Sequence, residues 1–328
     1  MIITRTPLRI SLVGGATDIP AFYTVHGGAV VSFTIDKYIY VSVNRKFDGR
    51  IRLSYSRTEN VDRPDQLKHD LARTCLEVFN EQGLEITSVA DIPGAGSGLG
   101  SSSAFTVGLL LALSELHAES AGWSPKSLAE MAFIVEHWLC GHEAGKQDQY
   151  AAAYGGFHFY EFCPNGHVRV EPIDLTDEEL VFIRARLMLF WTGKTRKAAP
   201  ILKEQSTHLS INKDHIENAN ILKGLAFQLR NDLCAHKLDN IGVTLNSGWM
   251  LKKQLADGIS NTWIDEIYHR ALIAGAQGGK ICGAGGGGFL LLWAEPQVQE
   301  EVAKAVGLRR VPFQFESNGS SVIYRSEE

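Results

Sequence analysis

Cysteine is scarce in this chain, and its spacing is unfavourable for a metal site. The five cysteines lie far apart, and no two of them form a CxxC pair. An odd, scattered set of this kind is typical of reduced thiols and gives no zinc-ligating pattern. We therefore expect a cytoplasmic protein without a zinc site. The cysteines are Cys75, Cys140, Cys163, Cys234 and Cys282.

Long apolar runs and an excess of positive charge are lacking as well. The longest apolar run, around VGLLLAL, is far too short to cross a bilayer. No charged-then-apolar signal opens the sequence, and MIITRTPLRISLV is typical of a first strand. The formal net charge of −5 argues against broad binding to nucleic acid or anionic membranes. The expected partners are therefore small molecules, and a homodimer is left open.

The composition is that of an ordinary globular protein: 328 residues with 45% hydrophobic and 21% charged residues. This length favours two domains that share a cleft. Strand and helix patterns are mixed without strict alternation, which predicts an α+β fold and disfavours a doubly wound sheet. The pattern shifts towards helices after about residue 190. Helices are expected at 63–83, 101–119, 125–140, 214–238, 261–279 and 296–307, and strands at 5–15, 38–47, 50–56, 85–92, 155–162, 167–175, 186–193, 289–294, 310–316 and 320–326.

The most informative segment is DIPGAGSGLGSSSAF, residues 91–105. It follows a predicted strand and leads into a predicted buried helix, whose N-terminus has free amides and a positive dipole end. Glycines let another molecule approach bare amides closely. A tight turn capped by serines is the alternative, but the glycines are more numerous than one turn requires. We interpret this segment as a phosphate-binding loop.

Two better-known phosphate motifs are excluded by their context. Gly283, Gly285 and Gly288 satisfy GxGxxG, but a strand-like FLLLW follows them where the Rossmann motif requires a helix. Gly193 belongs to a GKT sequence, but Met188 stands where the P-loop requires its first glycine. Both matches are interpreted as accidental.

Three charged residues suit phosphoryl transfer. Glu136 flanks the apolar face of the predicted helix 125–140, so it could supply the carboxylate that Mg²⁺ prefers, or could be a solvated helix residue. Asp148, in HEAGKQDQYAAAYGG, could accept a proton from a substrate hydroxyl, or could belong to a surface loop. Arg9 is a candidate partner that would keep Asp148 ionised. No cysteine lies in an obvious nucleophilic constellation, so no covalent intermediate is expected.

Taken together, three segments resemble the motifs of the GHMP kinases, the superfamily of galactokinase, homoserine kinase and mevalonate kinase. They are PLRISLVGGATD, PGAGSGLGSSSAF and KICGAGGGGFLLL, and their order and spacing match over nearly the whole chain. Within the superfamily, GKQDQYAAAYGGFHFYEF, FWTGKTRKA and GGKICGAGGGGF are most similar to the sugar-1-kinases that act on D-glycero-D-manno-heptose 7-phosphate. One departure is Ala16, where that branch commonly has glycine.

The resemblance implies a fold and an activity. The N-terminal domain, 1–188, would be similar to domain 2 of ribosomal protein S5. The C-terminal domain, 189–328, would be a ferredoxin-like α/β sandwich, with the active site between the two. The activity would be ATP-dependent phosphorylation of the anomeric hydroxyl of the heptose 7-phosphate to the 1,7-bisphosphate, on the route to a nucleotide-activated heptose for surface polysaccharide. ATP and Mg²⁺ would be the cofactors.

The resemblance also implies roles for individual residues. Asp148 would be the catalytic base or electrostatic positioner, with Arg9 beside it, and Ser102 and Glu136 would hold Mg²⁺. Asp18 would accept hydrogen bonds from sugar hydroxyls, and the segment 55–64 would belong to the nucleotide pocket. The predicted nucleotide-binding residues are Gly94, Gly96, Ser97, Gly98, Leu99, Gly100, Ser101, Ser102 and Ser103. The predicted acceptor-binding residues are Gly14, Gly15, Thr17, Asp18, Lys194, Arg196, Gly285 and Gly286.

The identity of the acceptor stays open at this point. A 7-phosphate needs cations, and TGKTRKAAP supplies Lys194 and Arg196, but a solvated basic turn would have the same sequence. One alternative is a kinase of the same fold that acts on an unphosphorylated sugar such as fucose or galactose. Another is a non-catalytic sugar or nucleotide sensor, which would not need to keep Asp148, Glu136 and Ser102 together.

Overall fold

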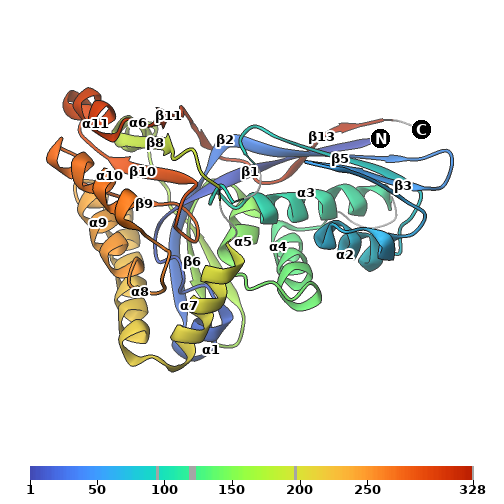
Figure 1. The fold of residues 1–328 in the computed structure, drawn as a ribbon, viewed down its shortest axis with the longest axis horizontal. Coiled ribbons are helices and arrows are strands. Elements are labelled where there is room, and N and C mark those ends of the chain that lie inside the picture. Colours follow the sequence, from blue (N-terminus) through green and yellow to red (C-terminus); the bar gives the residue numbers. More distant parts are fainter. Residues whose placement is uncertain (94–95, 118–122, 196–197, 327–328) are drawn as a thin grey trace.

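A computed structural model describes residues 1–93, 96–117, 123–195 and 198–326. In this part of the chain two β-sheets lie along the long axis of the molecule (Figure 1). The larger sheet has nine strands and the smaller has four. Helices accompany both sheets, and the mixed α+β class predicted from the sequence is confirmed.

The larger sheet is organised around two long antiparallel strands, β1 (Ile2–Val13) and β2 (Gly28–Arg45). One end of β2 pairs with β5 (Leu84–Ala90) and the other end with β6 (Phe157–Phe162). A single strand therefore joins the two ends of this sheet. The other strands of the larger sheet are β3 (Ile51–Ser54), β4 (Thr58–Val61), β7 (Val168–Pro172), β12 (Phe315–Glu316) and β13 (Ser321–Arg325).

The smaller sheet is antiparallel in the order β11-β8-β10-β9. All five residues of β10, the predicted strand FLLLW, are buried because β10 lies between two strands and against α9. Helices α8, α9, α10 and α11 lie beside this sheet in the left half of Figure 1, which confirms the shift towards helices after residue 190. The elements are β8 (Leu187–Trp191), β9 (Gly278–Ile281), β10 (Phe289–Trp293), β11 (Arg309–Arg310), α8 (Lys213–Cys234), α9 (Ile241–Lys252), α10 (Thr262–Ile273) and α11 (Gln299–Val306).

Helix α3 (Ser101–Leu116) is the central helix of the first half. It is apolar on all sides because it packs between β1 and β2 above and the helices α2, α4 and α5 around it (Figure 1). Gly108 allows this close approach, since a Cβ there would lie 2.7 Å from the Thr6 hydroxyl. The burial fixes the N-terminus of α3, to which the glycine-rich loop leads. The surrounding helices are α2 (Asp70–Phe79), α4 (Pro125–Phe133) and α5 (Gln147–Tyr154).

Three predicted elements differ in detail. The helix expected at 63–83 is a short 3₁₀ turn, η1 (Pro64–Gln66), followed by α2. The helix expected at 125–140 changes after α4 into a π-helical turn, η2 (Ile134–Leu139). The strand expected at 310–316 is divided, because the chain crosses there from β11 in the smaller sheet to β12 in the larger. Two further differences are larger: β2 begins at Gly28, well before the strand expected at 38–47, and β9 replaces the end of the helix expected at 261–279. The helix expected at 296–307 begins with a 3₁₀ turn, η3 (Pro296–Val298). Elements that were not predicted are α1 (Pro20–His26), β4, α5, α6 (Asp177–Arg186), α7 (Ala199–Ile211) and α9.

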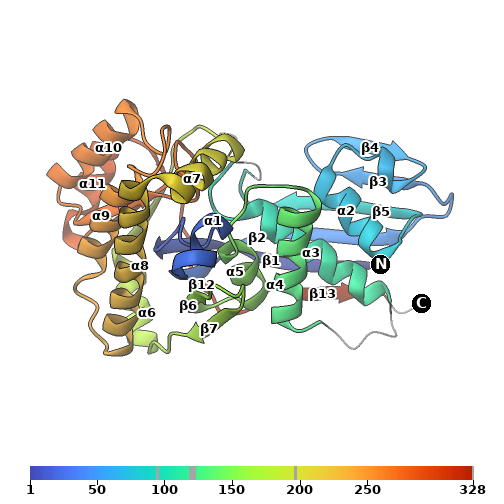
Figure 2. The same ribbon diagram turned by 90° about the horizontal axis from the view of Figure 1, so that it is seen from below.

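The last two strands of the chain, β12 and β13, belong to the larger sheet. β12 pairs with β2, and β13 pairs antiparallel with β1 beside the N-terminus (Figure 2). The division at residues 188 and 189 stays a prediction, and β8 spans it. In the described part of the chain, no helix combines the length and the apolar character needed to cross a membrane.

Candidate active site

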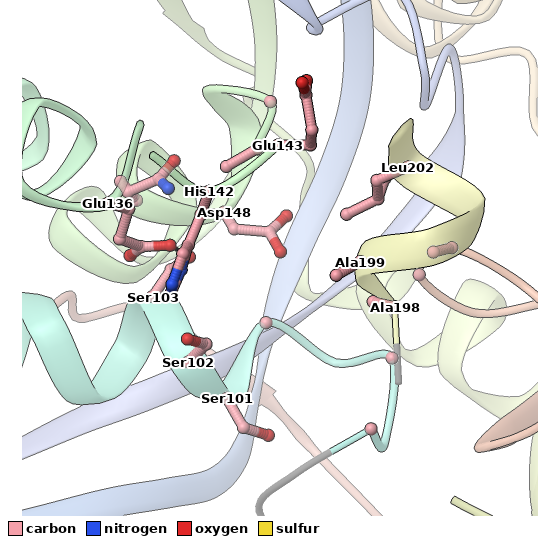
Figure 3. A pocket seen from close by; sticks show the side chains of 18 of the residues that line it. Ser101, Ser102, Ser103, Glu136, His142, Glu143, Asp148, Ala198, Ala199 and Leu202 are labelled. Atoms are coloured by element: carbon pink, nitrogen blue, oxygen red, sulfur yellow. Dashed lines mark hydrogen bonds between the residues drawn. The ribbon is translucent and has the colours of Figure 1, made fainter. Parts of the chain in front are cut away.

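A pocket of about 800 Å³ opens between α3, α5 and α7. Its lining includes the first turn of α3, the start of α5 and residues of both glycine-rich loops. Figure 3 shows Ser101, Ser102 and Ser103 at the head of α3, the Asp148 carboxylate pointing into the cavity, and Ala198, Ala199 and Leu202 on the opposite side. The pocket therefore brings together segments that are far apart in the sequence.

The predicted phosphate loop lies at this pocket and needs its glycines. Gly98 and Gly100 have φ angles of +81° and +79°, the left-handed region that favours glycine. A Cβ at Gly98 would lie 2.4 Å from the carbonyl oxygen of Cys282, so the two glycine-rich loops touch at this point. A Cβ at Gly100 would lie 3.4 Å from the Asp148 carboxylate. The loop is thus shaped by its neighbours as well as by any ligand.

Most of the predicted nucleotide-binding residues line the pocket: Gly96, Ser97, Gly98, Gly100, Ser101, Ser102 and Ser103. Leu99 faces the other way. Its side chain is fully buried, and its carbonyl accepts a hydrogen bond from the Arg9 amide at 3.0 Å. Gly94 lies outside the described residues. The Ser97 and Ser101 hydroxyls are 2.9 Å apart, a contact that ties the loop to the first turn of the helix.

Arg9 and Asp148 form the ion pair that the sequence suggested. The Arg9 Nε and Nη2 atoms donate to the two Asp148 oxygens, each at 2.8 Å, and Nη1 donates to the Gly98 carbonyl at 2.8 Å. Arg9 is almost fully buried, whereas a quarter of the Asp148 side chain is exposed, at the pocket. Asp148 lies in the first turn of α5, where the helix dipole favours a negative charge. The carboxylate is therefore held rigidly in one orientation beside the phosphate loop.

Glu136 is buried and lies beside the serines of α3. The π-helical turn at 134–139 explains this position, because i→i+5 bonding widens the turn and directs both Val135 and Glu136 inward. The Ser103 hydroxyl donates to Glu136 Oε2 at 3.0 Å, while Oε1 has no hydrogen-bond partner among the described residues. Burial raises the pKa of Glu136 to about 7. The carboxyl group is thus available for a positively charged ligand.

The oxygens around Glu136 fit Mg²⁺. Ser102 is exposed at the pocket, Ser103 supports the carboxyl group, and the unpartnered Oε1 atom offers a hard oxygen ligand. Within the described ranges, no cluster of three or more His, Cys, Asp or Glu side chains is placed to hold a metal ion. Mg²⁺ commonly takes one or two protein carboxylates together with substrate phosphates and water. The donor set fits an ion that arrives with a nucleotide.

The predicted acceptor loop Gly14–Asp18 is divided between structural and pocket-lining residues. Gly14 and Thr17 are structural: a Cβ at Gly14 would lie 1.9 Å from the Ala29 carbonyl oxygen, and the Thr17 hydroxyl donates to the Gly14 carbonyl at 2.8 Å. Ala16 and Asp18 line the pocket. The Asp18 carboxylate accepts hydrogen bonds from the amides of Ala16 and Gln147, at 3.1 and 3.2 Å. Burial, reinforced by the Asp148 charge, raises the pKa of Asp18.

The second glycine-rich loop reaches the pocket with its first residues only. Gly283 and Ala284 line the pocket. The predicted residues Gly285 and Gly286 lie against Ile259, whose carbonyl accepts a hydrogen bond from the Gly286 amide at 2.7 Å.

Of the two predicted acceptor cations, Lys194 lies beside this loop. The Lys194 ammonium lies 5.0 Å from the centre of the Trp263 ring, and Lys194 is exposed, not part of the pocket lining. Arg196 lies outside the described residues. Capture of the acceptor phosphate by this basic segment therefore stays a prediction.

An aromatic group lines the pocket in the first half of the chain. The His69 ring lies 4.8 Å from the Tyr55 ring and 4.9 Å from the Phe105 ring, measured between ring centres. All three residues line the pocket, together with Ser56. Flat, apolar surfaces of this kind suit stacking with a planar heterocycle. Sequence reasoning had included Tyr55 and Ser56 in the nucleotide pocket but had not identified His69 or Phe105.

Two buried lysines were also missed. Lys252, at the end of α9, lines the pocket and donates to the Gly283 carbonyl at 2.6 Å. Lys280, in β9, is buried behind it and donates to the Leu12 carbonyl at 3.5 Å. Burial lowers the pKa of Lys252 to about 8 and that of Lys280 well below its usual range. Lys252 lies in no motif, and Lys280 opens the motif KICGAGGGGFLLL, but nothing in the local sequence predicts that either ammonium is buried.

The similarity to known proteins agrees with this geometry. The family models for the N-terminal and C-terminal domains of GHMP kinases match residues 68–156 and 229–310. The chain is 31% identical over 317 residues to a D-glycero-α-D-manno-heptose 7-phosphate kinase of Campylobacter jejuni, covering 92% of each chain. The chain belongs to the GHMP kinase family. The resemblance noted in the three motifs is thereby confirmed.

Solved structures support the same fold over the full length. A D-glycero-D-manno-heptose 1-phosphate kinase from Bacteroides thetaiotaomicron matches with a TM-score of 0.79 and 26% identity, covering 100% of both chains. A putative sugar kinase from Campylobacter jejuni matches with a TM-score of 0.76 and 28% identity, covering 98% of this chain and 97% of that one. The chain thus has the two-domain α+β fold of the GHMP kinases, a family of ATP-dependent kinases that generally use Mg²⁺.

Proposed function

We propose that this GHMP kinase phosphorylates D-glycero-D-manno-heptose 7-phosphate at its anomeric hydroxyl. The product would be the 1,7-bisphosphate, on the route to a nucleotide-activated heptose for surface polysaccharide. The observation that carries the proposal is the Arg9–Asp148 pair, which lies beside the phosphate loop in one pocket. The similarity to a heptose 7-phosphate kinase over 92% of each chain supports the choice of acceptor.

The chain's own residues supply the parts of the reaction. The amides between Gly96 and Ser101 would hold the nucleotide phosphates at the head of α3. Asp148 would orient the anomeric hydroxyl and accept its proton as that oxygen bonds to the γ-phosphorus and the bond to the β,γ-bridging oxygen breaks, releasing ADP. Mg²⁺, held by Glu136 and Ser102, would neutralise charge on the phosphates. Positioning and electrostatics suffice for such a transfer.

The test is a panel of phosphorylated and free sugars, incubated with the chain, ATP and Mg²⁺. ADP release is followed, and NMR locates the phosphorylated carbon. We expect the heptose 7-phosphate to be the preferred acceptor and C1 to be the position. Preference for free fucose or galactose would favour the alternative of a kinase for unphosphorylated sugars. Absence of ADP release with every acceptor would favour a sugar or nucleotide sensor.

The phosphate of the acceptor would be captured by the basic segment that contains Lys194 and Arg196. A double substitution, Lys194→Met with Arg196→Met, is expected to raise the KM for the phosphorylated sugar. The KM for the corresponding free sugar should stay unchanged, since it has no phosphate for these cations to bind. An unchanged KM for the phosphorylated sugar would contradict the assignment of the 7-phosphate.

A further inference from the structure

Lys252 lies where the two predicted acceptor loops meet. Its ammonium donates to the Gly283 carbonyl at 2.6 Å, and it lies 3.3 Å from the position that a Cβ at Gly15 would occupy. The Gln147 side-chain nitrogen lies 3.6 Å from the same position. Lys252 and Gln147 both line the pocket. One charged donor from α9 therefore reaches both predicted acceptor loops, at Gly15 and at Gly283, and the pocket that it lines.

The ammonium has no partner that explains its burial. Only 6% of Lys252 is exposed, and among the described residues it forms no ion pair, so the charges of Asp18 and Asp148 act on it only from farther away. Among the described residues its single hydrogen-bond acceptor is the Gly283 carbonyl, although an ammonium group has three N–H donors. A buried charge is costly unless it is paired and fully hydrogen-bonded. The two remaining donors are available to a ligand in the pocket.

The neighbouring polar atoms repeat this pattern. Gln147 Oε1 and Gln205 Nε2 are buried atoms without hydrogen-bond partners among the described residues, and both side chains belong to the pocket lining. Buried polar groups in native proteins are almost always paired, and each unpaired one costs about 1–3 kcal/mol. A bound molecule with several hydroxyl groups would satisfy them, whereas a molecule with one hydroxyl group would not.

We propose that Lys252 is an acceptor-binding residue, whose free ammonium donors bind hydroxyl groups next to the one that is phosphorylated. This inference rests on the proposed function and deepens it, because it assigns the site to polyhydroxylated acceptors. Asp18 and Lys252 then form a complementary pair of contacts, one accepting hydrogen bonds from sugar hydroxyls and the other donating to them. A site built this way rejects an acceptor that lacks the hydroxyl group, since its own buried groups are left unpaired.

The experiment compares Lys252→Met with Lys253→Met as a matched control. Lys253 is the next residue along, its ammonium lies 3.4 Å from Asp265, and it does not belong to the pocket lining. We expect Lys252→Met to raise the acceptor KM at least about tenfold, with the KM for ATP little changed and the melting temperature unchanged or raised, because a buried charge is removed. Lys253→Met should behave as the wild type. Equal acceptor KM values in the two variants would overturn the assignment.

A second measurement uses acceptors that each lack one ring hydroxyl group, assayed with the wild type and with Lys252→Gln, a milder variant in case Lys252→Met does not fold. One deoxy acceptor should lose at least about tenfold in kcat/KM with the wild type and much less with the variant. If none of the deoxy acceptors behaves in this way, the assignment is overturned. A wild type that phosphorylates no sugar overturns the proposed function and this inference together. A wild type that phosphorylates a sugar, with Lys252→Met matching Lys253→Met, overturns the inference alone.

Discussion

The two walls of the pocket are built differently. The wall from the first half of the chain holds two polar pairs: Arg9 donates to Asp148 at 2.8 Å, and Ser103 donates to Glu136 at 3.0 Å. On the wall from the second half, Lys252 and Gln205 have few contacts with other polar groups. The polar pairs of the first wall are assembled before any ligand binds, although Glu136 Oε1 and Gln147 Oε1 on it are unpartnered among the described residues, and the second wall has donors without partners. We therefore expect the first wall to control turnover and the second to control the choice of acceptor.

The largest effect is expected from Asp148→Asn. The amide cannot accept the proton, although it can keep one hydrogen bond from Arg9, so kcat should fall at least about 1,000-fold, or about 4 kcal/mol. Acceptor KM should change little, since the second wall is intact. Steady-state kinetics of ADP release, with circular dichroism as a check of folding, measures this. Turnover close to that of the wild type would remove Asp148 from the reaction.

Gly98→Ala should have the next largest effect, because it attacks the point at which the two walls touch. A methyl group there would lie 2.4 Å from the Cys282 carbonyl oxygen, at a φ of +81°. We expect a loss of about 2–3 kcal/mol of unfolding free energy and a raised KM for ATP. Gly49→Ala is the matched control: it has a φ of +70° and nothing within 4 Å, so only the backbone strain applies. Urea unfolding compares the two, and equal losses would contradict the predicted clash.

The pH dependence of acceptor binding sharpens the comparison further. Burial lowers the pKa of Lys252 to about 8, with the Arg9 charge acting in the same direction and Asp18, Cys282 and Asp148 opposing it. The ammonium form is lost as the pH rises through about 8, so acceptor KM should rise there in the wild type. The residual activity of Lys252→Met should lack this rise. A profile that Lys252→Met leaves unchanged would assign the transition to another group.

The same pKa has a consequence for stability. Between about pH 8 and 10.5 the unfolded chain holds a proton on Lys252 that the folded chain has lost, so unfolding takes up protons. The unfolding free energy of the wild type relative to Lys252→Met should therefore rise with pH across this window, by up to about 3 kcal/mol. Below about pH 8 both states are charged and the difference should be constant. Urea unfolding at several pH values tests the sign.

The smallest effect is expected from Lys194→Met, because Lys194 does not belong to the pocket lining. Because Lys194 is exposed and its ammonium lies over the Trp263 ring, the loss of its charge should cost about 0.2–1 kcal/mol. That corresponds to an increase of about 1.5- to 5-fold in the KM for a phosphorylated acceptor. The free sugar should show no increase. Added salt should reduce the difference, because exposed charges are screened.

The sequence predicted the first wall better than the second, for a physical reason. The phosphate loop requires glycines and serines at fixed positions before a buried helix, so a motif marks it. The Arg9–Asp148 pair could be suggested because both residues lie beside such motifs. Lys252 and Gln205 come from ordinary helix sequences, and only folding brings them to the pocket. His69, on the first wall, was missed for the same reason. Their side chains could not be distinguished from solvated ones before the structure was known.

Local detail was also hidden in the sequence. The π-helical turn at 134–139 has a sequence that suits an α-helix, so the full burial of Glu136 could not be predicted. The mixed strand and helix order, by contrast, was sufficient for the α+β class. The segment 310–316 shows the limit of periodicity: it has the alternation of one strand, but tertiary pairing divides it between two sheets.

The pairing of β13 with β1 has a consequence for synthesis. β1 ends at Val13, and its partner strand is completed only at Arg325, so a growing polypeptide leaves one edge of β1 open until some three hundred further residues have been translated. The end of the larger sheet at Ile2–Arg5 is therefore completed only after almost all of the chain has been made. Deleting β13 should therefore destabilise the half of the molecule that is synthesised first, because β1 loses this partner strand.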